Sequence, residues 1–247
     1  MKRWLWISFV AVFFGVVFSS CLDEGEDYYA EEKIKIDAYL KISPYQFEKQ
    51  SSGLYYSKLE EGSGEKPVNG DFVVFSYVGR ILGRSSVFDT SIKDTAITYG
   101  IYYKNRYYAP LFTPLVHAEY PTRRLVFGLE EGLKLMSEGE RAAFIIPFSL
   151  GYGQNSFSSL PAYSTLFFDI KLEHVVSNPE EYEAEVLANF ISDNYADLEP
   201  EAEGYYFIEE VEGEGELIAE SDVININYTA YYLNGPAFFT TDQVLAS

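Results

Sequence analysis

The chain has 247 residues, of which 17% are aromatic, and its formal net charge is -20 at pH 7. So negative a surface repels nucleic acid and anionic lipid headgroups, which excludes nucleic-acid binding as an expected function. The single cysteine leaves no partner for a disulfide, so a packed core has to stabilise the fold. The length suffices for one domain and part of a second.

Residues 1–20 have the pattern of a lipoprotein signal peptide. Two basic residues, Lys2 and Arg3, precede an apolar run that is too short to span a bilayer comfortably. The sequence "FSSC" that follows resembles the lipobox of bacterial lipoproteins, which implies acylation of Cys21 and a lipid anchor in the cell envelope. An ordinary cleaved signal with an incidental cysteine is the alternative. Loss of the two basic residues takes the net charge from -20 to -22.

Residues 21–45 are predicted to form an acidic tether and an amphipathic helix. The run "CLDEGED" resembles the acidic export tags of surface lipoproteins of the Bacteroidetes, and a solvated tether is the alternative explanation. Ile36, Tyr39 and Leu40 follow at spacings of three and four, which indicates a helix that ends near Ser43.

From residue 53 onward the apolar residues alternate with a period of two, which is typical of strands. Five strands are expected, at residues 53–64, where the strand runs into a Gly-Ser-Gly turn, and at 70–82, 96–100, 141–148 and 165–175. One helix is expected among them, because Leu129, Leu133 and Met136 share a helical face. A single short helix among several strands without a βαβ alternation predicts an α+β fold with an antiparallel sheet folded over that helix.

The sequence then repeats itself at an offset of 151 residues. "GYYFIEEVEGEGE", which starts at Gly204, echoes "GLYYSKLEEGSGE", which starts at Gly53. Residues 178–203 are predicted to form a linker helix, and residues 204–247 a truncated second copy. Half a sheet cannot bury its own apolar face. Either the sequence is therefore part of a longer two-domain protein, or the half domain docks on the first copy or on a partner.

The motifs of the first unit, taken in order, resemble the FKBP-type peptidyl-prolyl isomerases. They are "GSGEKPVNGDFVVFSYVG", "FDTS", "LVFGLEEGLKLMSEGERAAFIIP", "LGYG" and "LPAYSTLFFDIKL". The resemblance implies an isomerase domain at residues 46–177, with an antiparallel sheet half-wrapped around a short helix and a shallow apolar pocket for a proline ring. It also implies an enzyme that assists the folding of exported proteins by acting on X-Pro bonds, without a cofactor or metal.

The same resemblance, carried over position by position, implies which residues form the pocket. The catalytic set is Tyr77, Phe88, Asp89, Val126, Tyr152 and Phe168, and the further substrate-binding set is Leu125, Leu129 and Leu160. Leu129 stands where family members commonly have a tryptophan, so a shallower and less aromatic floor is expected. Phe157 is only a candidate for the aromatic or histidine contact that family members have in the loop after Gly153. Plain core packing is the alternative for each aromatic residue, and above all for Phe168.

The proposed reaction fits a sequence with few catalytic groups. Rotation about an X-Pro bond crosses a barrier of about 18–20 kcal/mol that is set by amide resonance. A dry pocket favours the twisted, less polar amide, and the Tyr152 phenol and the Val126 N–H would hold the peptide. Asp89 is expected within reach of the Tyr77 hydroxyl, either as an acceptor that orients the pocket wall or as a carboxylate that only satisfies a buried hydrogen bond.

Other chemistry is poorly supported by the sequence. The two histidines, His117 and His174, are far apart and have no cysteine partner, so a metal site is not expected. No "GxSxG" elbow surrounds the loop serines, and hairpin turns explain the glycines.

Residues 101–123 form the least generic stretch, with five tyrosines and three prolines. They are expected to form either a lid over the pocket or an Ω-like loop packed on the sheet.

Two rival functions remain open on the sequence alone. One is an FKBP-like module that grips peptides or a partner protein without useful turnover. The other makes the duplicated unit a structural part of an envelope complex. In the second copy Thr240 stands where Asp89 would be and Ala230 replaces Gly79, so no activity is expected there.

Overall fold

The computed structural model describes residues 24–115, 125–195, 198–201, 204–233, 235 and 237–241. The predicted signal peptide, Cys21 and His117 lie outside these residues. In the part that is described, none of the helices combines the length and the apolar character needed to cross a bilayer.

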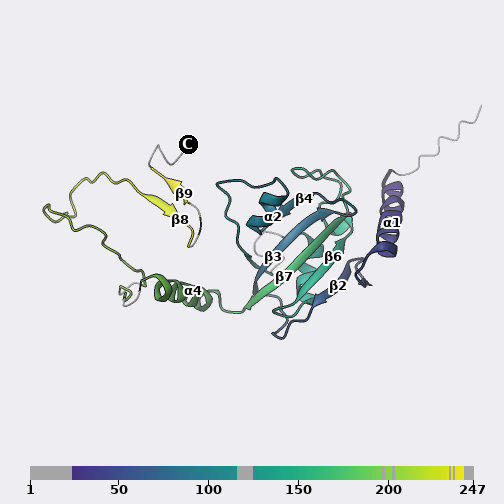
Figure 1. Cartoon of the computed structure of the whole chain (residues 1–247), viewed down its shortest axis with the longest axis horizontal. Helices are drawn as coiled ribbons and strands as arrows, with labels where there is room; N and C mark the ends of the chain where they lie inside the picture. Colours follow the sequence, from purple (N-terminus) through teal and green to yellow (C-terminus); the bar gives the residue numbers. More distant parts are fainter. Residues whose placement is uncertain are drawn as a thin grey trace, which may run out of the picture.

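The centre of the molecule is a seven-stranded antiparallel sheet (Figure 1). The strand order is β1-β2-β6-β7-β3-β4, and β5 pairs with the other end of β3. The strands are β1 (Glu48–Lys49), β2 (Tyr55–Glu60), β3 (Phe72–Ile81), β4 (Val87–Thr90), β5 (Leu111–Pro114), β6 (Arg141–Ile146) and β7 (Leu166–Val176). The helices of this unit are α1 (Glu24–Ile42), α2 (Lys93–Thr98), α3 (Phe127–Leu135) and the short 3-10 helix η1 (Phe148–Leu150). The predicted α+β class with an antiparallel sheet is confirmed.

Helix α3 covers one face of the sheet and forms the main core with it. Leu133 and Met136 are fully buried, together with Phe144 of β6. The helix can approach this strand because Gly132 has no side chain: a Cβ there would lie only 2.6 Å from the Phe144 ring. Because successive side chains of a strand point to opposite faces, alternate residues of β6 and β7 point towards the helix.

Helix α1 covers the opposite face of the same strands. Ile36 is buried against Ala143, Ile145 and Phe167, the residues of β6 and β7 that point away from α3. The predicted end of this helix is confirmed, but the tether expected before it is shorter, because the helix already begins at Glu24. Its first turns pack on the domain instead of lying in solvent, and that packing stabilises the longer helix.

Within α1, Glu32 is buried although it is a carboxylate. Only 7% of it is exposed, and Oε1 accepts hydrogen bonds from the Phe148 backbone N–H at 2.7 Å and from the Thr165 hydroxyl at 2.8 Å. Loss of hydration raises the pKa of Glu32 above its usual value, although both hydrogen bonds and the charge of Lys35 act in the opposite direction.

This raised pKa predicts a pH-dependent stability. The folded chain holds the proton of Glu32 more tightly than the unfolded chain, so its contribution is fully present below about pH 4.3 and is lost as the pH rises through the folded pKa. The free energy of unfolding of wild type minus that of Glu32→Gln should therefore fall between pH 4 and pH 7. Urea unfolding of both proteins across this range measures the difference, and a rise with pH would contradict the prediction.

One predicted strand is wrong. Residues 96–100 were expected to be extended, but α2 spans most of them, with the Ala96 N–H donating to the Ile92 carbonyl at 3.0 Å. Ala96 is fully buried under this single turn. A short apolar run has no periodicity that separates a strand from a buried helical turn, so tertiary packing decided between them.

The chain continues beyond the sheet into α4 (Pro179–Asn194), the predicted linker helix. The Asn178 side chain accepts a hydrogen bond from the Glu181 N–H at 3.3 Å, which caps the helix. Beyond it, β8 (Thr229–Tyr231) and β9 (Ala237–Thr240) form a hairpin (Figure 1). The counterparts expected for β2 and for most of β3 have no regular strand structure among the described residues of 204–228.

The β8–β9 hairpin corrects one predicted correspondence. Asp89 pairs with Gly79 in the first hairpin, and Phe239 pairs with Ala230 in the second. A constant offset of 151 had instead placed Thr240 opposite Asp89. The second turn is one residue shorter, so the offset is 151 before the turn and 150 after it. Phe239 therefore takes the place of Asp89, and it stacks on Tyr228 with ring centroids 5.3 Å apart.

Candidate active site

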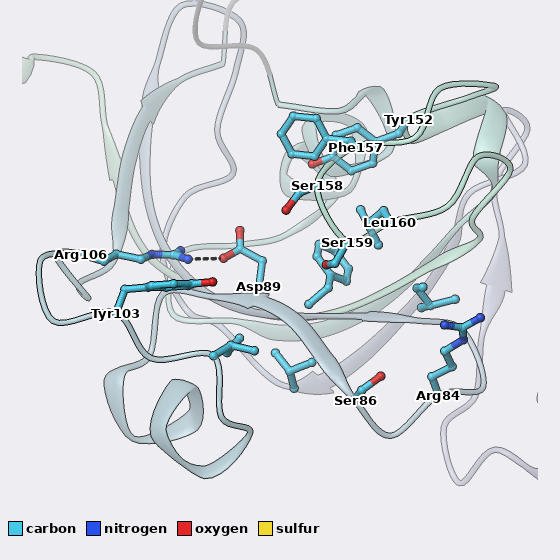
Figure 2. A pocket seen from close by; sticks show the side chains of 14 residues that line it. Arg84, Ser86, Asp89, Tyr103, Arg106, Tyr152, Phe157, Ser158, Ser159 and Leu160 are labelled. Carbon is cyan, nitrogen blue, oxygen red and sulfur yellow. Dashed lines mark ion pairs between the residues drawn. The ribbon is translucent and has the colours of Figure 1, made fainter.

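A cavity of about 540 Å³ opens beside β4. Its walls are β4 itself, the segment that follows α2, and the loop between η1 and β7. In Figure 2, Asp89 and Arg106 lie together on one wall, Tyr152 and Phe157 lie above them, and Arg84 marks the opposite end. The lining residues are Ile81, Arg84, Ser86, Val87, Phe88, Asp89, Ile101, Tyr103, Arg106, Tyr152, Phe157, Ser158, Ser159 and Leu160.

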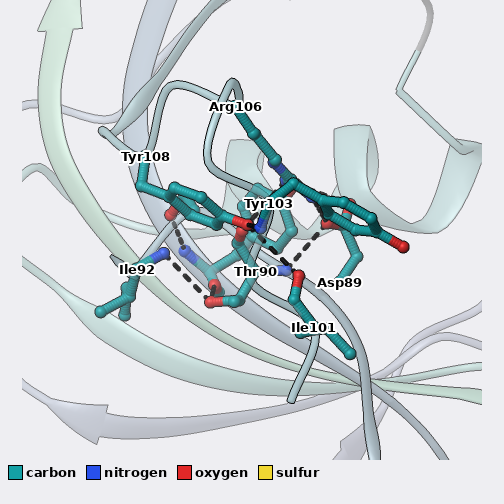
Figure 3. A network of polar contacts seen from close by, with 9 residues as sticks. Asp89, Thr90, Ile92, Ile101, Tyr103, Arg106 and Tyr108 are labelled. Atoms are coloured by element: carbon teal, nitrogen blue, oxygen red, sulfur yellow. Dashed lines mark hydrogen bonds and ion pairs between the residues drawn. The ribbon is translucent and has the colours of Figure 1, made fainter. Parts of the chain in front are cut away.

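Both oxygens of Asp89 are occupied by donors. The Tyr77 hydroxyl donates to Oδ2 at 2.8 Å, the contact expected from the sequence, and the Thr90 N–H donates to Oδ1 at 2.9 Å. Arg106 forms an ion pair with Oδ1 at 2.7 Å and donates to the Thr90 carbonyl at 3.0 Å (Figure 3). A carboxylate held by three donors is an acceptor that fixes its neighbours, and it is poorly placed to take a proton from a substrate.

Arg106 comes from a loop that a tyrosine folds back on itself. The Tyr108 hydroxyl accepts a hydrogen bond from the Tyr103 N–H at 3.0 Å and donates one to the Ile101 carbonyl at 3.3 Å (Figure 3). The Arg106 guanidinium lies 5.1 Å from the centre of the Tyr108 ring. These contacts fold the loop, and the bonds of Arg106 to Asp89 and Thr90 tie it to β4, so that Ile101, Tyr103 and Arg106 form one wall of the cavity.

The Phe88 ring connects this network to the core. Its centroid lies 5.7 Å from that of Phe168 at an interplanar angle of 90°, and the Tyr77 ring lies 6.0 Å from Phe168 on another side. The two phenylalanines can meet because Gly79 lies beneath them, where a Cβ would approach the Phe88 ring to 2.8 Å. The glycine in "YVGR" is therefore required by close approach of side chains to the backbone.

The opposite wall is aromatic. Tyr152 and Phe157 stack with ring centroids 4.8 Å apart and an interplanar angle of 6°. Burial, and to a smaller extent the charge of Asp89, raise the pKa of Tyr152. Burial followed by the charge of Asp89 also raises the pKa of Tyr77. Both phenols thus keep their protons at neutral pH and are donors.

The structure brings four of the nine predicted site residues to the cavity. They are Phe88, Asp89, Tyr152 and Leu160. The other five pack in the core cluster behind it: Tyr77, Leu125, Val126, Leu129 and Phe168. Leu129 is only 8% exposed, in the first turn of α3, so among the described residues it is a core residue beneath the site and does not line this cavity.

The sequence reasoning missed Arg106 and the other cavity residues of its loop. The only sequence signal for them is the concentration of basic and tyrosine residues in 101–123, which predicts either a lid over the pocket or a packed loop. The described part of this stretch combines the two: residues 101–106 form a wall of the cavity, and β5 packs on the sheet as an edge strand beside β3. Among the described residues, no three His, Cys, Asp or Glu side chains are grouped so as to hold a metal ion.

Comparison with known proteins shows which family this domain resembles. A model of the FKBP-type peptidyl-prolyl cis-trans isomerases matches residues 63–173. The FKBP-type isomerase FkpA of Escherichia coli K12 is 31% identical over 130 residues, which cover 53% of this chain and 40% of that protein. FkpA of Buchnera aphidicola from Schizaphis graminum is 34% identical over 126 residues, which cover 50% of this chain and 41% of that protein. The chain thus spans about two fifths of the length of these curated relatives.

The solved crystal structure of FkpA from Escherichia coli is 28% identical to this chain, with a TM-score of 0.47, and covers 63% of this chain and 62% of its own. The match of the family model includes the strand that carries Tyr77, the "FDTS" segment with Asp89, helix α3 and the loop with Tyr152. Residues 63–173, a little under half of this chain, thus match the model of the FKBP-type peptidyl-prolyl cis-trans isomerase family.

Proposed function

We propose that this chain is a peptidyl-prolyl cis-trans isomerase that acts on X-Pro bonds of polypeptides. The observation that carries the proposal is the cavity beside β4, which combines an aromatic wall with a carboxylate already held by donors. The described lining contains serine hydroxyls but no histidine or lysine to activate them, and isomerisation requires neither a nucleophile nor a base. The curated relatives named as isomerases match the same part of the chain.

The proposed mechanism uses burial and orientation. Phe88, Tyr152 and Leu160 would surround the proline ring and exclude water from the X-Pro amide. The planar amide is more polar than the twisted one, so loss of water raises the free energy of the planar form relative to the twisted form. The Tyr152 phenol would donate a hydrogen bond to the peptide, while Asp89 and Tyr77 keep the Phe88 wall in place.

Proline-exchange NMR on a short X-Pro peptide tests the proposal. We expect the purified chain to accelerate cis-trans exchange, which takes about tens of seconds without a catalyst. Tyr152→Phe should lower the acceleration about three- to tenfold, because one donor to the peptide is lost. Tyr45→Phe is the matched control, since Tyr45 packs on the opposite face of the sheet with Phe167 and should leave exchange unchanged. Peptide binding without faster exchange would contradict catalysis.

A second candidate function is a peptide-binding module without useful turnover. It is favoured by the position of Leu129, which packs in the core and leaves the cavity without an aromatic floor from α3. The proline-exchange measurement separates the two functions, because only the isomerase changes the exchange rate while both bind the peptide.

We further propose that the chain is a lipoprotein anchored through Cys21 in the cell envelope, where it assists the folding of exported proteins. The support is the charged, apolar and small-residue pattern that ends in "FSSC". An envelope protein partner is also part of this proposal, through the second copy. The intact mass of the protein from its native cell tests the anchor: a diacylated chain starting at Cys21 is expected, and an unmodified cysteine would contradict it.

The second copy is proposed to be inactive. Phe239 stands where Asp89 does in the first hairpin, so the acceptor for the tyrosine hydroxyl is replaced by a ring. The backbone arrangement is retained, because the Tyr228 N–H donates to the Thr241 hydroxyl at 2.9 Å as the Tyr77 N–H donates to the Ser91 hydroxyl. The described contacts of the second copy with the first domain include the stacking of Tyr232 on Tyr107, with centroids 4.8 Å apart, and a hydrogen bond from the Tyr107 hydroxyl to the Leu233 carbonyl at 3.2 Å.

A further inference from the structure

We infer that Glu32 of α1 is a positioning residue for the proposed isomerase, because its carboxylate joins the two ends of the loop that forms the aromatic wall of the cavity. This loop, residues 148–165, is called the pocket loop below. The inference rests on the proposed function, since it concerns the placement of Tyr152, Phe157 and Leu160 in the cavity.

The two hydrogen bonds of Glu32 lie at opposite ends of the pocket loop. Phe148, whose N–H donates at 2.7 Å, is the first residue of the loop, and Thr165, whose hydroxyl donates at 2.8 Å, is the last. One oxygen atom, Oε1, accepts both bonds. The separation of the two loop ends is therefore fixed by a single atom of a helix that lies 116 positions earlier in the sequence than the first donor.

The pocket loop needs such a constraint because its own structure is irregular. Beyond η1 it contains one isolated bridge, Phe157 to Leu160, among its described residues. Two of its non-glycine residues have positive φ angles, 52° at Ser158 and 56° at Tyr163. Residues in such conformations cost free energy and persist only where surrounding contacts hold them.

Aromatic contacts from α1 support the same loop. Tyr28 stacks on Tyr163 with centroids 3.7 Å apart and an interplanar angle of 5°, and Tyr29 packs on Phe148 at 4.7 Å. Phe148 and Tyr163 in turn meet edge to face at 5.2 Å. Helix α1 thus contacts the loop near both ends, and one of the contacts is on a residue with a positive φ angle.

Glu32 and the two residues that donate to it are all buried, so the loss of these hydrogen bonds should be costly. Glu32 is 7%, Phe148 3% and Thr165 5% exposed, so water cannot readily replace the carboxylate. A buried N–H and a buried hydroxyl that lose their acceptor destabilise the arrangement that holds them, and the loop ends would move to recover partners. Because Tyr152 and Phe157 lie between those ends, their positions over Asp89 would change with them.

The test compares Glu32→Ala with Glu32→Gln and Glu31→Ala. Glu32→Ala removes the oxygen that accepts both bonds and should lower kcat/KM for an X-Pro peptide about tenfold, mainly through a higher KM, as expected for misplaced contacts. The glutamine oxygen can accept the same two bonds, so Glu32→Gln should retain activity within about threefold of wild type. Glu31→Ala is the matched control on the same helix, since Glu31 pairs only with Lys35 at 3.4 Å in the described structure.

A second readout follows the loop directly. Backbone amide NMR signals of Tyr152, Phe157 and Leu160 should shift in Glu32→Ala, stay near their wild-type positions in Glu32→Gln and be unchanged in Glu31→Ala. This readout needs no turnover, so it still tests the inference if the wild-type chain fails to accelerate exchange, a result that would overturn the proposed function alone.

If Glu32→Ala does not fold, Thr165→Val is measured in its place. It removes one of the two donors at nearly constant volume and should shift the same three amide signals and raise KM about threefold. Unchanged amide signals in a folded Glu32→Ala or Thr165→Val protein, or an activity within twofold of wild type, would overturn the inference. Equal losses in Glu32→Ala and Glu32→Gln would also overturn it, since the acceptor would then not matter.

Discussion

Replacing Asp89 by alanine should lower kcat/KM for an X-Pro peptide about ten- to a hundredfold, because the cavity wall loses the group that organises it. Three donors converge on Asp89, from Tyr77, Thr90 and Arg106. Without the carboxylate, the loop that supplies Arg106 loses its ion pair to β4 and keeps the hydrogen bond from Arg106 to the Thr90 carbonyl. Proline-exchange NMR measures the activity loss.

Stability should change much less than activity in this variant. Asp89 and Arg106 are each 35% exposed at the side chain, and ion pairs of that exposure are worth only about 0–1 kcal/mol. The free energy of unfolding in urea should therefore fall by about 1 kcal/mol or a little more. A Tm that collapses together with activity would show that Asp89 is a core acceptor only, the alternative raised by the sequence.

A double-mutant cycle tests whether Asp89 and Arg106 act on activity through their shared contact. Arg106→Ala should lower kcat/KM less than Asp89→Ala, since Tyr77 and Thr90 still donate to the carboxylate. The double variant should resemble Asp89→Ala, because residues that act through one contact are not additive. Arg84→Ala is the control, as Arg84 lines the opposite end of the same cavity. Additive losses would contradict a shared role.

Phe144→Ala should destabilise the domain by about 3–5 kcal/mol, which is a large part of the stability of a domain of this size. The Phe144 side chain is fully buried and packs between Gly132 of α3 and Tyr56 of β2. Its removal leaves a cavity between α3 and the sheet, where Gly132 lies close to the Phe144 ring. Urea unfolding followed by circular dichroism measures the loss.

Phe157→Ala removes the same side chain from a different environment and is the matched control. Phe157 is 56% exposed and stacks on Tyr152 at the cavity. The free energy of unfolding should therefore change by less than about 0.5 kcal/mol. Activity should fall severalfold, because Tyr152 loses the ring that orients it. A stability loss as large as that of Phe144→Ala would contradict the core assigned to α3 and β6.

Much of the fold could be predicted because its strongest signals are local. The alternation along β7 and the spacing of Leu129, Leu133 and Met136 record which face of each element is buried, and the unbroken apolar run of β6 fits a strand that is covered on both faces. The "FDTS" and "LGYG" motifs likewise brought Asp89 and Tyr152 into the predicted site. Local patterns failed at residues 96–100, where five residues are too few to separate a strand from a turn of helix.

Contacts between distant segments were decided only by the tertiary structure. Arg106 reaches Asp89 because Tyr108 folds its loop back, and nothing in the spacing of these residues encodes that path. Glu32 meets Phe148 and Thr165 because α1 packs across the outer face of the sheet, although an acid in a helix is by itself a solvated residue. Sequence patterns therefore determined which surfaces are buried, since burial depends on the period of each element, whereas the pairing of buried polar groups required the three-dimensional arrangement of the elements.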